Sequence, residues 1–318
     1  MTRRHIPQGV LDAAHARSAA RAARDWDEAD RLRADIEAAG WTIVDRGTDF
    51  ALSPTTAADV VEGERVRFGS SGAVPARFDE PPIGLATVVL VATDRPDDLG
   101  RSLKGLLATS PPGTTVVIVA DGPSDTQAVA LDTLPSDASV EIVWTLDRLG
   151  VAAAANIGIR RSRGPVVILL DDGLEPTGDV VTPLVDALAD LDVAIAGGWG
   201  SASEDLRRFA EAPPGDVDAI DPGCVAFRRA DAIARGPLDE GFRSPASLAT
   251  WWSLVLRDEG EDAPPRRALR LERLPVSGEP GASAAPVGGG PATDRAVRRD
   301  RYRIIDRFGW RRDLLTRR

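Results

Sequence analysis

Carboxylate and guanidinium side chains stand directly after a series of short apolar segments in the middle of the sequence. This combination suits a divalent cation that bridges the diphosphate of a nucleotide, because hard cations prefer oxygen ligands and usually keep phosphate as a partner. Arginines at the same place would offset phosphate charge. The polar residues that follow the apolar segments are Thr93, Asp94, Arg95, Asp121, Arg148, Asp171 and Asp172.

Several other chemistries are excluded by the residues that are missing. The sequence has no G-x-x-x-x-G-K-[ST] phosphate loop and no G-x-S-x-G nucleophile turn. Its two histidines, His5 and His15, precede all the apolar segments, which excludes a Ser-His-Asp hydrolase there. Cys224 is the single cysteine, so an intrachain disulfide and a Cys/His zinc site are excluded as well.

The apolar segments have the length of strands and alternate with helical stretches. Continuous apolar strands between helices are typical of a mainly parallel sheet that helices cover on both faces, an α/β fold. Ligands of such sheets bind at the carboxyl ends of the strands, so we expect the polar residues above to meet at one edge. The predicted strands are 86–92, 114–120, 140–146, 165–170 and 193–198, and the predicted helices are 96–109, 151–162 and 180–190.

The length and the net charge of the chain limit the classes of protein to which it can belong. The chain has 318 residues, enough for about two domains, and a formal net charge of −10. An acidic protein is a poor binder of nucleic acid in general, so no specific nucleic-acid partner is expected. No apolar segment reaches the roughly 18 residues of a membrane helix, and the first twenty residues lack the apolar core of a signal peptide. These features predict a cytoplasmic location.

Composition changes along the chain predict four regions. Residues 1–52 read as two helices and a hairpin, 53–85 as a linker, 86–290 as the α/β domain and 291–318 as a basic C-terminal helix or tail. Residues 295–318 hold ten arginines against three aspartates. This helix either packs on the protein with a solvated basic face or contacts an anionic membrane or an acidic partner.

The N-terminal region carries a local resemblance. Asp25 and Glu28 have the spacing of a capping box, which predicts the start of a helix. Residues 24–52, RDWDEADRLRADIEAAGWTIVDRGTDFAL, resemble the C-terminal tail module of cysteinyl-tRNA synthetases. The resemblance implies a shared small module and no catalytic role.

Four ordered segments of the α/β region resemble family 2 glycosyltransferases, which have the GT-A fold. The third is the most specific, because G-x-A-A-A-x-N-x-G-I before a strand that ends in L-D is hard to match by chance. Together they cover residues 86–260, and the fold implied is a GT-A-like, mainly parallel sheet. The segments are ATVVLVATDRPDDLGRSLKGLL, TTVVIVADGPSD, LGVAAAANIGIRRSRGPVVILLDDGLEP and CVAFRRADAIARGPLDEGF.

This resemblance implies the transfer of a sugar from a nucleotide-diphosphate donor to an acceptor that the sequence leaves open, with Mg²⁺ or Mn²⁺ as a cofactor. Asp171 stands where the family's metal-binding Asp-x-Asp begins, and Asp172 is the carboxylate next to it. The donor-binding residues implied are Thr93, Asp94, Arg95, Asp121, Arg148 and Asn156.

The sequence departs from the family pattern on the catalytic side. Gly173 replaces the second aspartate of Asp-x-Asp, and adjacent carboxylates at a strand end point in opposite directions. Ser247 and Ala249 stand where the family has the acids that deprotonate the acceptor, so no catalytic base is identified. The alternative is a degenerate, non-catalytic relative that serves as a binding or scaffold module.

Overall fold

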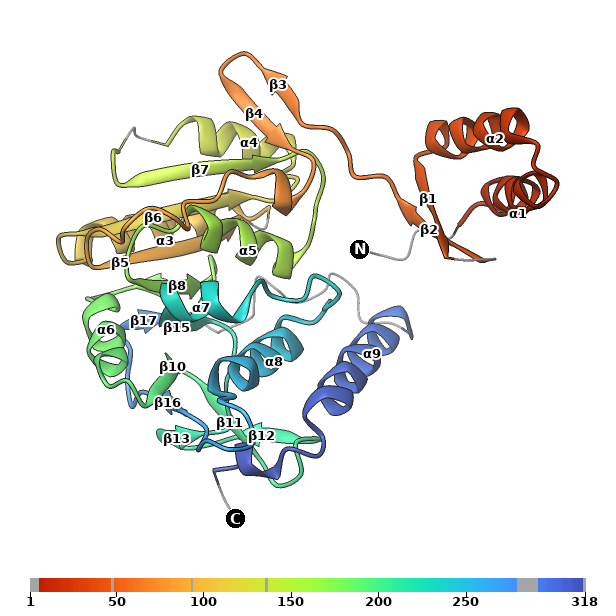
Figure 1. Cartoon of the computed structure of the whole chain (residues 1–318). Helices are drawn as coiled ribbons and strands as arrows, with labels where there is room; N and C mark the ends of the chain where they lie inside the picture. Colours follow the sequence, from red (N-terminus) through yellow and green to blue (C-terminus); the bar gives the residue numbers. More distant parts are fainter. Residues whose placement is uncertain (1–5, 47–48, 93, 135–136, 279–290, 317–318) are drawn as a thin grey trace. The chain divides into compact units, whose positions relative to one another are not determined.

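The chain forms two compact units, residues 1–58 and 59–318. Their boundary falls inside the segment 53–85 that the sequence predicts to be a linker, so that residues 59–85 belong to the larger unit. The computed structural model describes residues 6–46, 49–92, 94–134, 137–278 and 291–316 (Figure 1).

The smaller unit combines two helices with an antiparallel hairpin. Asp25 caps the second helix, since its side chain accepts a hydrogen bond from the backbone N–H of Glu28 at 3.2 Å. Apolar residues from both helices and from the hairpin form a small core of their own. The elements are α1 (Gln8–Ala22), α2 (Trp26–Ala38), β1 (Trp41–Arg46) and β2 (Asp49–Pro54).

A ten-stranded sheet forms the centre of the larger unit, in the order β13-β16-β10-β15-β8-β5-β6-β7-β4-β3 among the described residues (Figure 1). Its middle strands are parallel, and β5 lies between β6 on one side and β8 on the other. They coincide with the strands predicted from the sequence, because each is an apolar run buried by helices on both faces. These strands are β5 (Ala86–Ala92), β6 (Thr114–Ala120), β7 (Val140–Thr145) and β8 (Val166–Leu170).

Beyond β8 the sheet becomes mixed. Strand β15 (Cys224–Arg228) is antiparallel to both β8 and β10 (Val193–Gly197), so β10 again runs in the direction of β8. Strand β16 (Arg267–Arg270) is parallel to β10, and β13 (Gly215–Val217) is antiparallel to β16. The predicted mixed, mainly parallel sheet is thereby confirmed. Short strands outside it are β9 (Glu175–Pro176), β11 (Gly200–Ser203), β12 (Phe209–Glu211), β14 (Ala219–Ile220) and β17 (Val276–Ser277).

Helices cover both faces of the sheet, and each face has its own core. Val88 and Leu90 pack in one core with α3 and α6, whereas their neighbour Val89 packs in the other with α5, α8 and α9. This follows from the alternation of side chains along a strand. The helices are α3 (Pro96–Thr109), α4 (Asp125–Asp132), α5 (Val151–Arg161), α6 (Val181–Ala189), α7 (Arg229–Arg235), α8 (Pro245–Arg257) and α9 (Pro291–Phe308), with short 3₁₀ turns at Ser71–Ala73 and Arg312–Leu314.

Residues 59–85 join the sheet at its edge. Strand β4 (Arg65–Phe68) pairs in parallel with the end of β7, and β3 (Val60–Glu62) pairs with β4. Farther along, the backbone N–H of Ile83 donates to the carbonyl of Arg163 at 2.8 Å. Part of the segment that the sequence predicts to be a linker is therefore paired with the main sheet.

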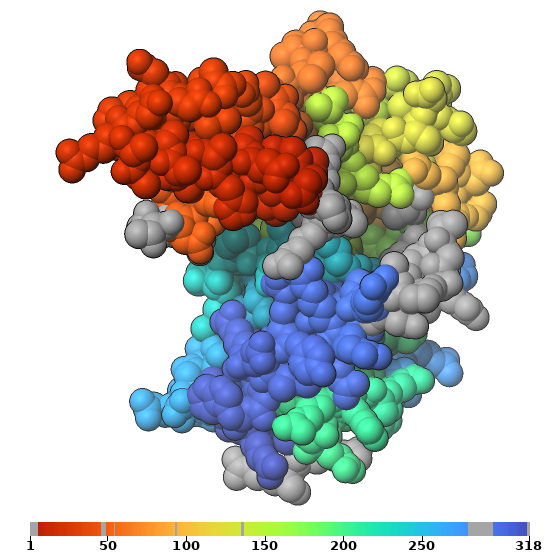
Figure 2. Space-filling view, turned by 90° about the vertical axis from the view of Figure 1, so that its right-hand side faces the viewer, coloured from red at the N-terminus to blue at the C-terminus, as the bar shows by residue number. Residues whose placement is uncertain are grey.

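The basic C-terminal helix packs against α8. Ile304 and Phe308 of α9 are buried in the core, and the guanidinium of Arg307 lies over the ring of Trp251. The other side of α9 (blue in Figure 2) is exposed and carries Arg298 and Arg301. A contact of this basic side with an anionic membrane or an acidic partner stays a prediction. Within the residues described, no helix has both the length and the apolar character to cross a membrane.

Candidate functional site

The carboxyl ends of β5, β6, β7 and β8 meet at one edge of the sheet, as their parallel pairing requires. Chain order reverses direction at β5, because β6 and β7 lie on one side of it and β8 lies on the other. Such a switch point is where open α/β sheets bind ligands. We refer to the loops that follow these four strands as the carboxyl edge.

Asp121, after β6, holds the loop that leads into α5. Its carboxylate accepts hydrogen bonds from the backbone N–H groups of Leu149 and Gly150 at 2.7 and 2.9 Å. The hydroxyl of Thr145 donates a third bond at 3.2 Å. Burial raises the pKa of Asp121, and the three hydrogen bonds oppose that rise. Both carboxylate oxygens are thus engaged in shaping the loop 147–150.

Asp94 and Arg148 form an ion pair that joins the end of β5 to the end of β7. The other oxygen of Asp94 accepts the backbone N–H of Ser124, after β6, at 2.8 Å. Partial burial raises the pKa of Asp94, but the bonds from Ser124 and Arg148 prevail and hold it below its usual value. Asp94 also has a φ of +62°, a conformation that aspartate tolerates better than most residues.

Two further predicted donor-binding residues lie near Asp94 in the sequence. Arg95 occupies the position before the first residue of α3 without a capping side-chain bond, and it approaches Asp98, with 3.6 Å between Nη1 and Oδ2. Its side chain is largely exposed at the carboxyl edge. Thr93 lies outside the described residues.

Asn156 is buried in α5, and its side chain forms hydrogen bonds with the loop 238–240. Its amide nitrogen donates to the carbonyl oxygen of Leu238 at 3.0 Å and to Oε1 of Glu240 at 2.9 Å. Its amide oxygen accepts the backbone N–H of Leu238 at 2.9 Å. Asn156 therefore positions residues 238–240, and the side chain of Glu240 also accepts the hydroxyl of Ser71 at 2.5 Å.

Asp171 and Asp172 follow β8 and differ in exposure. Asp171 is half-buried, and its Oδ1 accepts the backbone N–H of Gly173 at 2.9 Å, whereas Asp172 is 1% exposed. Both residues lie in the turn that follows β8, where the backbone N–H of Leu174 donates to the carbonyl oxygen of Asp171. Among the residues that the structure describes, no group of three or more His, Cys, Asp or Glu gathers to hold a metal ion. A cation here would have Asp171 as the more accessible carboxylate and would need ligands from a bound phosphate.

Helix α8, which packs against α5, carries no carboxylate. Ser247 and Ala249 are half-buried in its first turns. Trp251 and Trp252 are buried and stacked, with ring centroids 6.1 Å apart. Trp252 also packs edge-on against Phe227 of β15. The tryptophan pair is therefore part of the core and does not form an open platform for a sugar.

Arg243 is a polar residue at this edge that sequence reasoning did not identify. It lies between α7 and α8, and a β-carbon placed on Gly150 would stand 3.5 Å from its Nη1. The backbone N–H of Arg243 donates to Asp300 of α9 at 2.8 Å. No pattern in the sequence links Arg243 to Gly150 or to Asp300, because all three come from distant parts of the chain.

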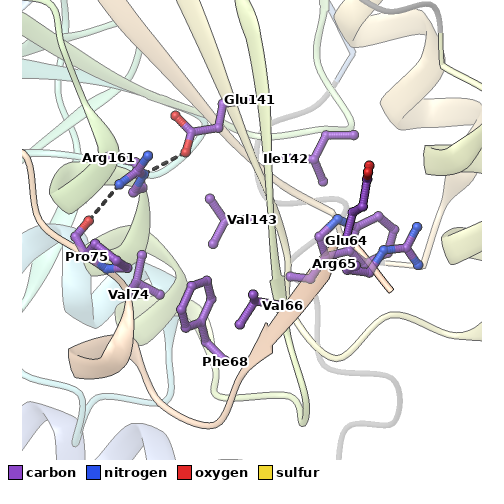
Figure 3. A pocket seen from close by; sticks show the side chains of 11 residues that line it. Glu64, Arg65, Val66, Phe68, Val74, Pro75, Glu141, Ile142, Val143 and Arg161 are labelled. Atoms are coloured by element: carbon purple, nitrogen blue, oxygen red, sulfur yellow. Dashed lines mark hydrogen bonds and ion pairs between the residues drawn. The ribbon is translucent and has the colours of Figure 1, made fainter. Parts of the chain in front are cut away.

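A separate cavity of about 440 Å³ lies beside β7, where β4 stops pairing with it (Figure 3). Arg161 reaches across one wall to Glu141, with 2.6 Å between Nε and Oε1. At another wall, the guanidinium of Arg65 lies 3.9 Å from the ring centre of Trp144. None of the predicted donor or metal residues lines this cavity. It is therefore distinct from the carboxyl edge.

Comparison with known proteins shows what the larger unit is similar to. Residues 87–215 match the sequence model of the family Glycosyl transferase family 2. No curated protein matches the chain. Among solved structures, GalNAc-T7 with UDP, GalNAc and Mn²⁺ is similar with a TM-score of 0.53 at 16% identity, over 70% of this chain and 48% of that one. The chain thus spans about half the length of that relative.

Two other similar structures have lower scores. A mannosyltransferase from Pyrobaculum calidifontis, in complex with GDP-Man and Mn²⁺, gives a TM-score of 0.47 at 19% identity, over 63% of this chain and 57% of that one. TarS of S. aureus gives 0.46 at 10% identity, over 60% and 36%. The predicted resemblance to family 2 glycosyltransferases is confirmed over residues 87–215, and the GT-A-like fold is confirmed by the likeness to GalNAc-T7. The resemblance of residues 24–52 to a synthetase tail stays a prediction.

Proposed function

We propose that the larger unit binds a nucleotide-diphosphate sugar at the carboxyl edge and transfers the sugar to an acceptor. The observation that carries this proposal is the network in which Asp94 joins Ser124 and Arg148 while Asp121 holds the loop before α5. This network links three strand ends at the switch point of the sheet, and it lies within the residues that match the glycosyltransferase family. Polar groups fixed in this way can orient a ligand without rearranging.

The donor-binding residues have different roles in this proposal. Asp94 and Asp121, with Thr93, surround the base and ribose of the donor. Asp121 acts through the loop that it shapes. Arg95 and Arg148 offset the charge of the diphosphate at the edge. Asn156 acts at a distance, because its hydrogen bonds position the loop 238–240.

A divalent cation is part of the proposal, with Asp171 as its protein ligand. The described residues do not form a complete metal centre, so the phosphates of the donor would supply the remaining ligands. The similar structure of GalNAc-T7 was determined with Mn²⁺, which supports the choice of metal. When bound, the cation would stabilise the negative charge of the departing diphosphate. Asp172 is buried and would support Asp171 from behind.

A second candidate is a non-catalytic relative that binds a nucleotide or its sugar. The specific observation in its favour is that α8 carries Ser247 and Ala249 at the positions where the family pattern has acids. Inverting transfer requires a base within hydrogen-bond reach of the acceptor hydroxyl. Both candidates share the donor site and differ in turnover.

Calorimetric titration tests the shared donor site. Wild-type protein is titrated with UDP, GDP, ADP, CDP and dTDP, each with MnCl₂ and with EDTA. We expect one of them to bind with a dissociation constant between about 1 μM and 1 mM, the usual range for enzyme substrates, and more tightly with Mn²⁺. Asp94→Asn is expected to weaken this binding. Failure of all five nucleotides to bind would remove both candidates.

A turnover assay then separates the two candidates. With the matching sugar nucleotide, an active transferase releases free nucleoside diphosphate, whereas a binding module leaves the donor intact. Release is measured with and without added protein over several hours. A rate indistinguishable from the spontaneous one would favour the non-catalytic candidate.

A further inference from the structure

Arg243 has an unusual charge environment. It is half-buried, and within the described residues its guanidinium makes no hydrogen bond or ion pair. Burial lowers the pKa of Arg243; the nearby charge of Asp300 opposes this, and the charges of Arg299 and Arg303 add to it. A cation that is partly withdrawn from water without a partner is unfavourable, so such a group is suited to an anion that arrives from outside.

The carboxylate nearest to this arginine is used for another purpose. Oδ2 of Asp300 accepts the backbone N–H groups of Arg243 and Ser244, at 2.8 and 2.7 Å. Oδ1 of Asp300 is buried and accepts no hydrogen bond from the described residues. Asp300 thereby fixes the backbone of the loop before α8 and leaves the guanidinium directed toward Gly150.

The place that the guanidinium reaches is the loop 147–150. Asp121 holds this loop, and Arg148 in the same loop is already paired with Asp94. Asp94 therefore compensates part of the positive charge of Arg148, whereas the guanidinium of Arg243 is available to an anionic ligand. The two arginines approach the loop from different elements, since Arg243 comes from the segment before α8.

We propose that the guanidinium of Arg243 binds the diphosphate of the donor at the carboxyl edge. This inference rests on the proposed function and adds a residue to it. A guanidinium presents parallel N–H groups that match two phosphate oxygens, which gives strong and directional binding. Gly173 stands where the family pattern has a second metal-binding carboxylate. The guanidinium of Arg243 therefore takes over part of the task of offsetting the charge of the diphosphate. Nucleotide binding then persists in part without a divalent ion.

Helix α9 has a positioning role in this arrangement. Asp300 fixes the backbone at Arg243, and the ion pair of Arg303 with Asp239 ties the same helix to the preceding loop. Arg299 and Arg303 also add positive potential around Arg243. The basic C-terminal helix is thus linked to the donor site by contacts that its own sequence does not indicate.

The test measures binding of the tightest of the five nucleoside diphosphates, and of its parent nucleoside, by calorimetry and ligand-observed NMR. Arg243→Gln is expected to weaken the diphosphate roughly tenfold or more, the loss of one charge-assisted contact, and to leave the nucleoside unchanged. Arg243→Lys keeps the charge and is expected to lose less. Arg301→Gln is the matched control, because it removes an exposed positive charge from α9 away from Gly150.

The divalent ion gives a second readout. In EDTA, wild-type protein is expected to retain measurable diphosphate binding and Arg243→Gln to lose it, while both bind with Mn²⁺. If Arg243→Gln does not fold, the comparison of Arg243→Lys with Arg301→Gln carries the test. Melting curves of all variants establish that they are folded.

Each other outcome has a definite meaning. Diphosphate binding that is equal in wild type and Arg243→Gln would overturn the inference and leave the proposed function standing. Equal losses for diphosphate and nucleoside, or a lower melting temperature with unchanged binding, would mean that Arg243 serves the fold and would also overturn it. If wild-type protein binds none of the five nucleotides, the proposed function and this inference both fail.

Discussion

The two sides of the carboxyl edge differ in how polar they are. On the side of β5, β6 and β7, Asp94, Asp121 and Arg148 are tied together by hydrogen bonds and an ion pair. On the side of α8, Ser247 and Ala249 stand where the family pattern has acids, and buried tryptophans follow them. The first side holds the residues that we propose to bind the donor, whereas α8 lacks an acid that could activate an acceptor.

This difference separates the residues proposed to bind the donor from the positions at which a catalytic base is expected. The match to the glycosyltransferase family ends at residue 215, so it includes Asp94, Asp121 and Asp171 and stops before α8. The family match and the intact hydrogen-bond network therefore coincide. The side without carboxylates lies in the part of the chain that the match does not reach, and it is the part to test for loss of activity.

The largest effect is expected from Asp121→Asn. The amide that replaces the carboxylate places an NH₂ group against a backbone N–H of the loop 147–150, so at least one hydrogen bond is lost in a buried place. We expect a loss of about 1–3 kcal/mol in the free energy of unfolding and loss of nucleotide binding. Urea denaturation and calorimetry measure the two effects. Stability and binding that both equal those of wild type would contradict the role given to Asp121.

A smaller effect is expected at the boundary between the two sides, from Asp171→Asn. This change keeps the size of the side chain but removes the charge that a cation needs, so the gain in nucleotide affinity on adding Mn²⁺ should disappear while binding in EDTA persists. Gly173→Asp is the complementary variant and should increase the gain. A gain from Mn²⁺ that is unchanged in Asp171→Asn would refute the metal assignment.

Adding an acid to α8 tests directly whether the absence of a base there limits turnover. Ser247→Glu and Ala249→Glu each place a carboxylate where the family pattern has one. If the missing base limits the protein, one of these variants should release nucleoside diphosphate from the donor faster than wild type. Thr250→Glu, a neighbour in the same turn whose side chain is buried, serves as the control. Brisk turnover by wild-type protein would mean that a base exists elsewhere.

The smallest effect concerns pH. The pKa of Asp94 is below its usual value in the folded protein, so its ionised form stabilises the fold above about pH 4, and this contribution is lost as the pH falls through the folded pKa. Melting temperatures of wild type and Asp94→Asn should therefore differ most at neutral pH and converge below about pH 4. A difference that stays constant from pH 7 to pH 3 would argue against the ion pair with Arg148.

Much of the larger unit could be predicted from local sequence. The apolar runs 86–92, 114–120 and 140–146 are long enough for strands and are bounded by polar residues, so strand positions and the carboxyl edge followed from periodicity. The role of residues 59–85 did not follow, because their prolines, glycines and charges are also those of a linker.

The roles of individual site residues required the tertiary structure. Asn156 reads equally well as a ligand contact or as a structural residue, and its bonds to Leu238 and Glu240 decide for a positioning role. The sequence of the C-terminal helix allows packing with a solvated basic face or contact with an anionic partner, and the burial of Ile304 and Phe308 shows that the helix is packed.

The sequence alone determined the fold class, the positions of the central strands along the chain and the end of the sheet at which polar residues gather. These depend on periodicity and on the fixed geometry of strands, which are local properties of the chain. The tertiary structure alone decided that Asp121 holds the loop before α5 and that Arg243 reaches Gly150. Such contacts join residues far apart in sequence, and their partners are selected by the packing of whole elements, which no local pattern encodes.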